Sequence, residues 1–239
     1  MVIDARDLHF KDLNQRIRQS GEEKIKIENC CGQRYIGSGM AGKELQIYGV
    51  PGNALGAYLS GGTIYVHGNG QDAVGDTMDS GAIYIDGLLG DAAGYAMRGG
   101  SIYVHGNVGY RAGIHMKAYE EKRPLLVIGG EAGSFLGEYQ AGGTIVVLGL
   151  HSDGYPVGNF CGMGMHGGRI FLRSETPPPA LSERLLCDKA SAQELDSIQP
   201  ALEQFSRLFN EDLGEILSKP FYCIVPDSKN PYQQLYTAC

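Results

Sequence analysis

The chain of 239 residues carries a formal net charge of −7, and 36 of its residues are glycine. This acidic balance argues against nucleic acid and anionic membrane surfaces as main partners. Since the sequence lacks both an apolar run of the ~18 residues that span a membrane and the apolar core of a signal peptide, we expect a cytoplasmic protein.

The first segment, residues 1–24, is predicted to contain a short amphipathic helix. Leu8, Leu13 and Ile17 share one side of that helix, and Gly21 would end it.

Residues 25–173 repeat with a period of 19 residues. The glycines of the best-preserved copies are Gly49, Gly52, Gly56, Gly61 and Gly62, then Gly87, Gly90, Gly94, Gly99 and Gly100, then Gly130, Gly133, Gly137, Gly142 and Gly143. A fixed period of about 20 residues is typical of a solenoid. Because the glycines are interleaved with isoleucine, valine and leucine, the composition indicates an ordered fold.

Each repeat unit begins with two apolar residues that are separated by one other residue, which is the alternation of a strand with one buried face. These pairs are Ile25/Ile27, Leu45/Ile47, Ile64/Val66, Ile83/Ile85, Ile102/Val104, Leu126/Ile128, Ile145/Val147 and Ile170/Leu172. The unit is too short for a strand plus a long helix. We therefore predict an all-β solenoid of about seven coils, with two or three short strands per coil and glycines at the corners.

Two further positions of the repeat are predicted to line the core. One holds Leu59, Met78, Met97, Met116 and, after an insertion, Met165; the other holds Leu55, Val74, Ala93, Ala112 and Leu136.

An outward-facing column beside the strands is also largely apolar. It consists of Gln46, Tyr65, Tyr84, Tyr103, Val127, Val146 and Phe171. A continuous apolar surface is usually covered. The N-terminal helix, the C-terminal helices or a partner subunit could do so, and we favour the chain's own terminal segment.

The next outward column holds Tyr48, His67, Asp86 and His105. Two histidines that flank a carboxylate suggest metal ligands, but strand spacing puts His67 and His105 about 9.6 Å apart. A hydrogen-bonded ladder of histidine and aspartate is therefore the prediction, and metal binding is the weaker alternative.

Four carboxylates cluster in neighbouring coils, namely Asp72, Asp76, Asp79 and Asp91. We interpret them as solvated corner residues, with a cation site as the minority alternative.

Two coils carry extra residues, around Lys117–Arg123 and within His151–Gly164. Insertions in a solenoid become surface loops, and loops commonly carry recognition. We therefore expect these two loops to contact partners.

The last segment, residues 174–239, starts with a stiff proline run at 177–179. A helix is predicted next, followed by a strand over 221–225. The apolar face of the helix is Leu195, Ile198, Leu202, Phe205, Leu208 and Phe209. The chain thus divides into an N-terminal helical segment (1–24), the repeat (25–173), and a linker with a helical tail (174–239) that packs on the repeat or on a partner.

The sequence shows no P-loop, HExxH helix or Ser–His–Asp order. Its six cysteines have neither CxxC spacing nor matching histidines, which favours free thiols. These are Cys30, Cys31, Cys161, Cys187, Cys223 and Cys239. We expect no catalytic, cofactor-binding or metal-binding residue in the chain.

Several short segments, taken together, form a pattern that is specific to one protein family. They are Gly32-Gln-Arg-Tyr-Ile36, Pro51-Gly-Asn53, Gly75-Asp-Thr-Met78, Gly90-Asp91, Gly94-Tyr-Ala-Met97, the runs 109–117, 137–139 and 162–168, and the tail Phe221-Tyr-Cys-Ile-Val-Pro226. With them the chain resembles the GXGXG domain at the C-terminus of the large (alpha) subunit of glutamate synthase. The resemblance implies a single-stranded right-handed β-helix.

The resemblance also implies a stand-alone, archaeal-type subunit with a structural role. In that family the domain holds an amidotransferase domain and a synthase domain in position while ammonia passes between them. The expected partners are a glutamine amidotransferase subunit and an FMN/iron–sulfur synthase subunit, with a homo-oligomer as a further option. No catalytic residue or cofactor transfers to this chain, so any enzymatic role would come from an oxidoreductase complex.

Two alternatives remain open. Formylmethanofuran dehydrogenase has a subunit that is built on the same repeat, although the N-terminal segment and the tail over 220–226 fit glutamate synthase better. A polysaccharide-binding β-helix is the other, with Tyr65, Tyr84 and Tyr103 as its aromatic platform.

Overall fold

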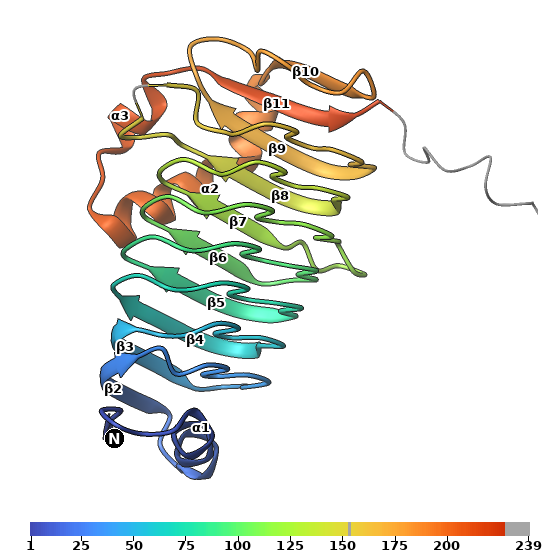
Figure 1. Cartoon of the computed structure of the whole chain (residues 1–239). Coiled ribbons are helices and arrows are strands. Elements are labelled where there is room, and N and C mark those ends of the chain that lie inside the picture. The colour runs from blue at the N-terminus through green and yellow to red at the C-terminus, as the bar shows by residue number, and fades with distance from the viewer. Residues whose placement is uncertain (153, 228–239) are drawn as a thin grey trace, which may run out of the picture.

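A computed structural model describes residues 1–152 and 154–227, so position 153 of the second insertion and the predicted free thiol Cys239 lie outside the described residues. One sheet of 11 strands runs the length of the molecule (Figure 1). The strands are β1 (Val2–Asp4), β2 (Lys24–Cys31), β3 (Glu44–Val50), β4 (Ser60–His67), β5 (Ser80–Ile85), β6 (Ser101–Val104), β7 (Leu125–Ile128), β8 (Ala141–Val147), β9 (Gly167–Arg173), β10 (Leu185–Lys189) and β11 (Phe221–Pro226).

The described residues contain three helices, so the fold is mostly β. These are α1 (Phe10–Gln19), α2 (Ala192–Phe209) and α3 (Leu213–Leu217). None of the helices in this part of the chain is long and apolar enough to cross a membrane.

The strands lie side by side in chain order from β1 to β9 and pair in parallel, and β11 and β10 then complete the sheet in antiparallel orientation. The register follows the repeat. Tyr65 pairs with Tyr84, and Tyr84 pairs with Tyr103. Beyond the first insertion Tyr103 pairs with Val127. The predicted strand positions and the predicted outward column are therefore confirmed.

The prediction of two or three strands per coil is wrong, because each described unit has one strand and the remainder consists of turns with isolated bridges. One turn position has a left-handed backbone in seven described units, and none of its residues is glycine. Its residues are Tyr35, Ala54, Ala73, Ala92, Arg111, Phe135 and Phe160, with φ between 56° and 64°. A left-handed residue interrupts an extended strand. Even so, the turn amides remain paired between units, for example Gly75 N–H with Leu55 C=O at 2.8 Å.

Glycine is required two positions after this left-handed residue. Gly75 has a φ of +69°, and a Cβ atom there would collide with the side chain of Ile102, two strands further along the sheet. Gly113 has a φ of +70° and would collide with Ile145 in the same way. These glycines let the turn approach the strand side chains closely.

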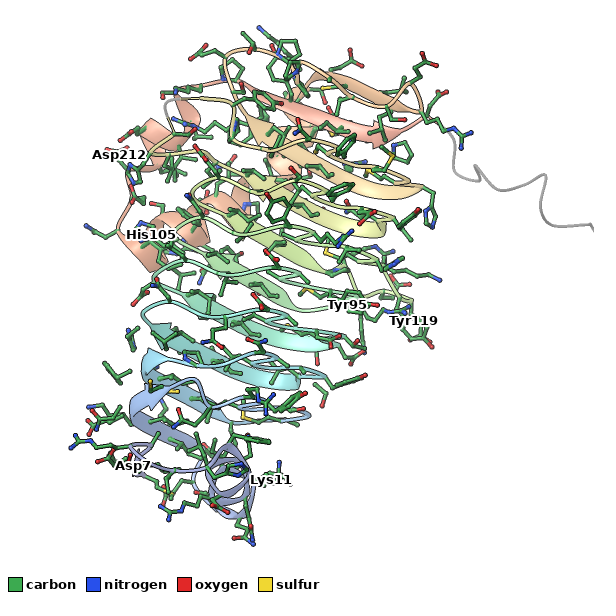
Figure 2. The ribbon with its side chains drawn as sticks, viewed as in Figure 1. Asp7, Lys11, Tyr95, His105, Tyr119 and Asp212 are labelled. Carbon is green, nitrogen blue, oxygen red and sulfur yellow. The ribbon has the colours of Figure 1, made fainter. Side chains whose placement is uncertain are left out.

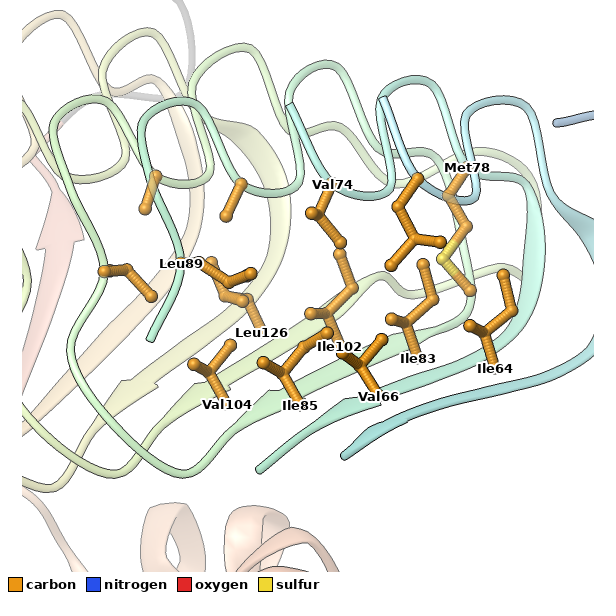
Figure 3. Close-up of a cluster of buried hydrophobic side chains, with 14 of the residues drawn as sticks. Ile64, Val66, Val74, Met78, Ile83, Ile85, Leu89, Ile102, Val104 and Leu126 are labelled. Atoms are coloured by element: carbon orange, nitrogen blue, oxygen red, sulfur yellow. The ribbon is translucent and has the colours of Figure 1, made fainter. Parts of the chain in front are cut away.

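The main core lies between the inner face of the sheet and the turns. Figure 3 shows Ile64, Ile83 and Ile102 of the strands facing Val74 and Met78 of the turns. The two predicted core columns are buried, including Met97, Met116 and Met165, so that prediction is confirmed. Gln140 takes the place of a methionine between Met116 and Met165, and it is 0% exposed.

Helix α2 covers the upper part of the outward column. A capping box at Ser191 and Glu194 starts the helix. Its buried residues pack with Tyr103, Val127, Val146 and Phe171 in a second apolar cluster. The buried residues of α2 are Ile198, Ala201, Leu202 and Phe205. The expectation that a terminal segment of the chain covers this column is therefore confirmed for its upper half.

The ends of the chain hold two strands that the sequence pattern missed. Strand β1 pairs in parallel with β2, and β10 pairs with β11. Helix α1 is confirmed, with Leu13 and Ile17 buried, but it starts at Phe10 and Leu8 precedes it. The predicted strand at 221–225 is also confirmed, as β11.

Candidate functional site

His67, at the end of β4, makes part of the predicted ladder. Its Nδ1 lies 3.0 Å from Asp86 Oδ2, and its Nε2 lies 2.8 Å from Gln46 Oε1. The imidazole stacks on Tyr48 with ring centroids 4.4 Å apart. Both ring nitrogens thus contact side chains of the two adjacent units. His67 therefore links three neighbouring units through hydrogen bonds, which is a structural role.

His105 does not join this ladder. Its Nε2 lies 2.7 Å from Glu211 Oε1, and its ring stacks on Phe209 at 4.8 Å with an interplanar angle of 5°. The prediction of a ladder that continues from Asp86 to His105 is therefore wrong. The cause is tertiary, because the end of α2 packs beside the strand end and supplies the carboxylate that His105 contacts.

His151 approaches the same carboxylate from the second insertion. Its Nε2 lies 3.8 Å from Glu211 Oε1. One ligand-type atom each from His105, His151 and Glu211 falls within 4.8 Å of the others. We call these three residues the histidine–glutamate cluster. Sequence reasoning missed His151 and Glu211 as site residues, and the only signal was that His151 lies in an insertion already expected to carry recognition.

The four clustered aspartates take part in structural contacts. Asp72 Oδ1 accepts a hydrogen bond from Asp91 N–H at 2.9 Å, and Asp91 Oδ1 accepts one from Tyr110 N–H at 2.8 Å. Asp79 pairs with Lys122 of the first insertion, with Nζ–Oδ2 at 2.6 Å. These contacts favour the corner interpretation over a cation site.

A second candidate surface lies on the turns. We call Tyr95, Arg111, His115, Phe135, Tyr139 and Phe160 the aromatic patch. His115 stacks on Tyr139 at 5.3 Å and meets the edge of Tyr95 at 6.0 Å. Phe135 stacks on Phe160 at 4.9 Å, and the Arg111 guanidinium lies over Phe135 at 5.3 Å.

The aromatic patch is open to solvent. Tyr139 is 40% exposed and Phe160 is 52% exposed. Phe135, Tyr139 and Phe160 occupy recurring turn positions, and the φ of each is positive. In Figure 2, Tyr95 and Tyr119 of the first insertion lie on one side of the molecule, and His105 lies on the other. The patch and the histidine–glutamate cluster are therefore separate surfaces.

Two hollows adjoin the patch. One of about 250 Å³ is lined by Tyr139, Met163, Met165, Arg184 and Leu185 among others. The other, of about 390 Å³, is lined by Tyr155, Phe160, Cys161, Met163, Pro179 and Leu181 among others. Burial raises the pKa of the Tyr155 phenol, whose hydroxyl has no hydrogen-bond partner among the described residues.

The model of the GXGXG motif family matches residues 17–226. The uncharacterized protein MJ1350 of Methanocaldococcus jannaschii is 44% identical over 251 residues, which cover 99% of this chain and 96% of that protein.

A solved structure also resembles the chain. It is a chain of the formyltransferase/hydrolase complex FhcABCD from Methylorubrum extorquens, determined with methylofuran. The TM-score is 0.63 at 20% identity, with 87% of this chain and 79% of that chain covered. At this identity the likeness shows a shared fold.

Proposed function

Because the chain belongs to the GXGXG motif family, the family of the C-terminal domain of the glutamate synthase large subunit, we propose that it is a non-catalytic structural subunit of a glutamate synthase complex. Its partners would be a glutamine amidotransferase subunit and an FMN/iron–sulfur synthase subunit. Together they would transfer the amide nitrogen of glutamine to 2-oxoglutarate in the cytoplasm. The chain itself would contribute neither a catalytic residue nor a cofactor.

The stacked units would form a single-stranded right-handed β-helix of about seven coils. Parallel pairing in chain order and a constant register support this architecture. We also propose the division of the chain at residues 24 and 173, although strands on both sides of each boundary pair in the same sheet. A single apolar cluster includes Ile3, Leu13 and Ile224, so the outer segments share the core of the repeat.

A rigid column suits a subunit that holds two reaction centres at a fixed separation. Ammonia made at one centre must reach the other before it escapes, so the distance and orientation between the centres matter. Continuous hydrogen bonding from unit to unit resists bending of the column. The wall of the column, rather than an enclosed active site, would then be the functional part.

The aromatic patch is the structural observation that supports a role in binding partner subunits. Tyrosine, phenylalanine, methionine and arginine are enriched at protein interfaces, and exposed aromatic side chains commonly act as their anchors. The patch presents Tyr139, Phe160 and Arg111 beside the exposed Met163. Tyr119, from the first insertion, extends the same side of the molecule (Figure 2).

Co-purification from the native host tests the proposal. The tagged full chain should capture an amidotransferase subunit and a flavin-containing subunit, and a Tyr139→Ala/Phe160→Ala double variant should lose at least one of them. Tyr58→Ala is the matched control, because Tyr58 occupies the repeat position of Tyr139 and is also exposed with a positive φ. Capture of neither subunit by the wild-type chain would refute the assignment. The purified chain should also be colourless, so a bound flavin would refute the absence of a cofactor.

A second candidate is a subunit like the one that carries this repeat in formylmethanofuran dehydrogenase. The likeness to a chain of the formyltransferase/hydrolase complex favours it. The same experiment separates the candidates, because this one predicts capture of formyltransferase or hydrolase subunits.

Polysaccharide binding at the tyrosine column has less support. Tyr103 is only 5% exposed beneath α2, which leaves Tyr65 and Tyr84 as the open part of the proposed platform. Soluble oligosaccharide should therefore leave the tyrosine fluorescence unchanged.

A further inference from the structure

We propose that the histidine–glutamate cluster is a Zn²⁺ site that fastens the C-terminal helices to the sheet. His105 follows β6, His151 lies in the second insertion, and Glu211 follows α2, so one ion would join three segments that are distant in the sequence. This inference is independent of the glutamate synthase proposal, and it departs from the sequence-based expectation of a chain without metal ligands.

The donor set matches zinc chemistry. Imidazole nitrogen and carboxylate oxygen are ordinary zinc ligands at about 2.0–2.2 Å, and sites with three protein ligands complete a tetrahedron with water. Ligand atoms around such an ion lie about 3.3 Å apart. The distances from Glu211 Oε1 are 2.7 Å to His105 Nε2 and 3.8 Å to His151 Nε2, so they lie on either side of that value. Small side-chain rotations would bring the three atoms to it.

Two of the three ligands are held in place by their surroundings. The ring of His105 stacks face to face on Phe209. The backbone of Glu211 bonds to the last turn of α2, since its N–H donates to Ser206 C=O at 3.1 Å and its own C=O accepts from Ser206 Oγ at 2.7 Å. Such support keeps metal ligands oriented for an incoming ion.

The third ligand is free to adjust. The side chain of His151 is 75% exposed, whereas that of Glu211 is 21% exposed. An arrangement with two fixed ligands and one adjustable ligand explains why His151 stands at 3.8 Å rather than in direct contact. Binding of the ion would then join His151 of the insertion to the end of α2.

Zinc binding by the full chain tests the proposal. After chelator treatment and dialysis, titration calorimetry with ZnCl₂ should show one site, and Co²⁺ should give the visible absorption of a tetrahedral ion. His151→Ala and Glu211→Gln should each weaken Zn²⁺ binding at least about tenfold. His67→Ala is the control, because His67 lies on the same outward column and contacts Asp86 and Gln46 instead.

Zinc should also raise the melting temperature of the wild-type chain and of His67→Ala, but not that of His151→Ala. Because His151 is exposed, its alanine variant should remain folded without metal. Absence of zinc binding by the wild-type chain would overturn the proposal. Undiminished affinity in His151→Ala would also overturn it, since the ion would then bind elsewhere.

Discussion

His105 and Glu211 are 106 residues apart in the sequence, yet His105 Nε2 lies 2.7 Å from Glu211 Oε1. This contact joins the end of a repeat strand to the end of α2. It lies beside an aromatic pair in which the buried Phe205 meets the partly buried Phe209, with ring centroids 4.8 Å apart. The C-terminal helices are thus part of the structure that closes the outer face of the sheet.

Phe205→Ala should lower the free energy of unfolding by about 3–5 kcal/mol, because it opens a cavity between α2 and the sheet. Phe205 is completely buried. Urea denaturation measures the change. Phe160→Ala, at an exposed aromatic of similar size, should change stability by only about 0.5 kcal/mol. Equal losses in the two variants would show that α2 does not hold the outer face.

Gly75→Ala should destabilise the chain more than Gly39→Ala. Both glycines have a positive φ, but an added Cβ meets Ile102 at Gly75 and open space at Gly39. In both variants an alanine must adopt a left-handed backbone conformation, which costs about 1–2 kcal/mol. Crowding should add about 1–3 kcal/mol at Gly75 alone. Thermal unfolding of the two variants checks the order, and a greater loss in Gly39→Ala would contradict the packing argument.

Gln140→Met should stabilise the chain by about 1 kcal/mol. Gln140 Nε2 donates to Gly142 C=O and Gly143 C=O at 3.2 Å each, whereas its Oε1 has no partner among the described residues. A buried acceptor without a partner costs stability. Methionine already fills this repeat position at Met116.

The reciprocal control is Met116→Gln, which should lower stability by about 1–3 kcal/mol. Chemical denaturation measures both variants. If Gln140→Met is the less stable protein, the amide oxygen of Gln140 must be satisfied in solution, for instance by an internal water.

Stability should fall as the pH rises above about 9. Burial raises the pKa of the Cys161 thiol from 9.0 to about 12, with Cys187 as a smaller cause. Between these values the folded chain keeps this proton while the unfolded chain loses it. The contribution of Cys161 to the free energy of unfolding is therefore complete below pH 9 and is lost between pH 9 and 12. The slope for one such thiol approaches about 1.4 kcal/mol per pH unit.

Urea unfolding under reducing conditions at pH 8 and pH 10 measures this loss. Cys161→Val should reduce it, whereas Cys31→Ser, at an exposed thiol, should not. The remaining loss would come from Cys30, Cys223 and Tyr103, whose pKa values burial also raises to about 12. Identical pH profiles for the wild-type chain and Cys161→Val would contradict the assignment.

The repeat made much of this fold predictable. A residue and its neighbour in the next strand are usually 19 positions apart, so a recurring pattern identifies the contact. The paired columns of Tyr65, Tyr84 and Tyr103 followed from that rule alone. The burial of Gln140 was less evident, because a polar residue stands there at the repeat position of Met97.

The sequence by itself determined the strand positions within the repeat, their register and the two core columns, because in a stacked repeat each unit meets the next through contacts of short and regular separation. Only the tertiary structure decided the rest. Helix α2 packs over Tyr103 and Phe171. His105 contacts Glu211, and Tyr139 and Phe160 are exposed on the turn face. Contacts between segments far apart in the chain have no periodic signal, so they depend on how the whole molecule packs.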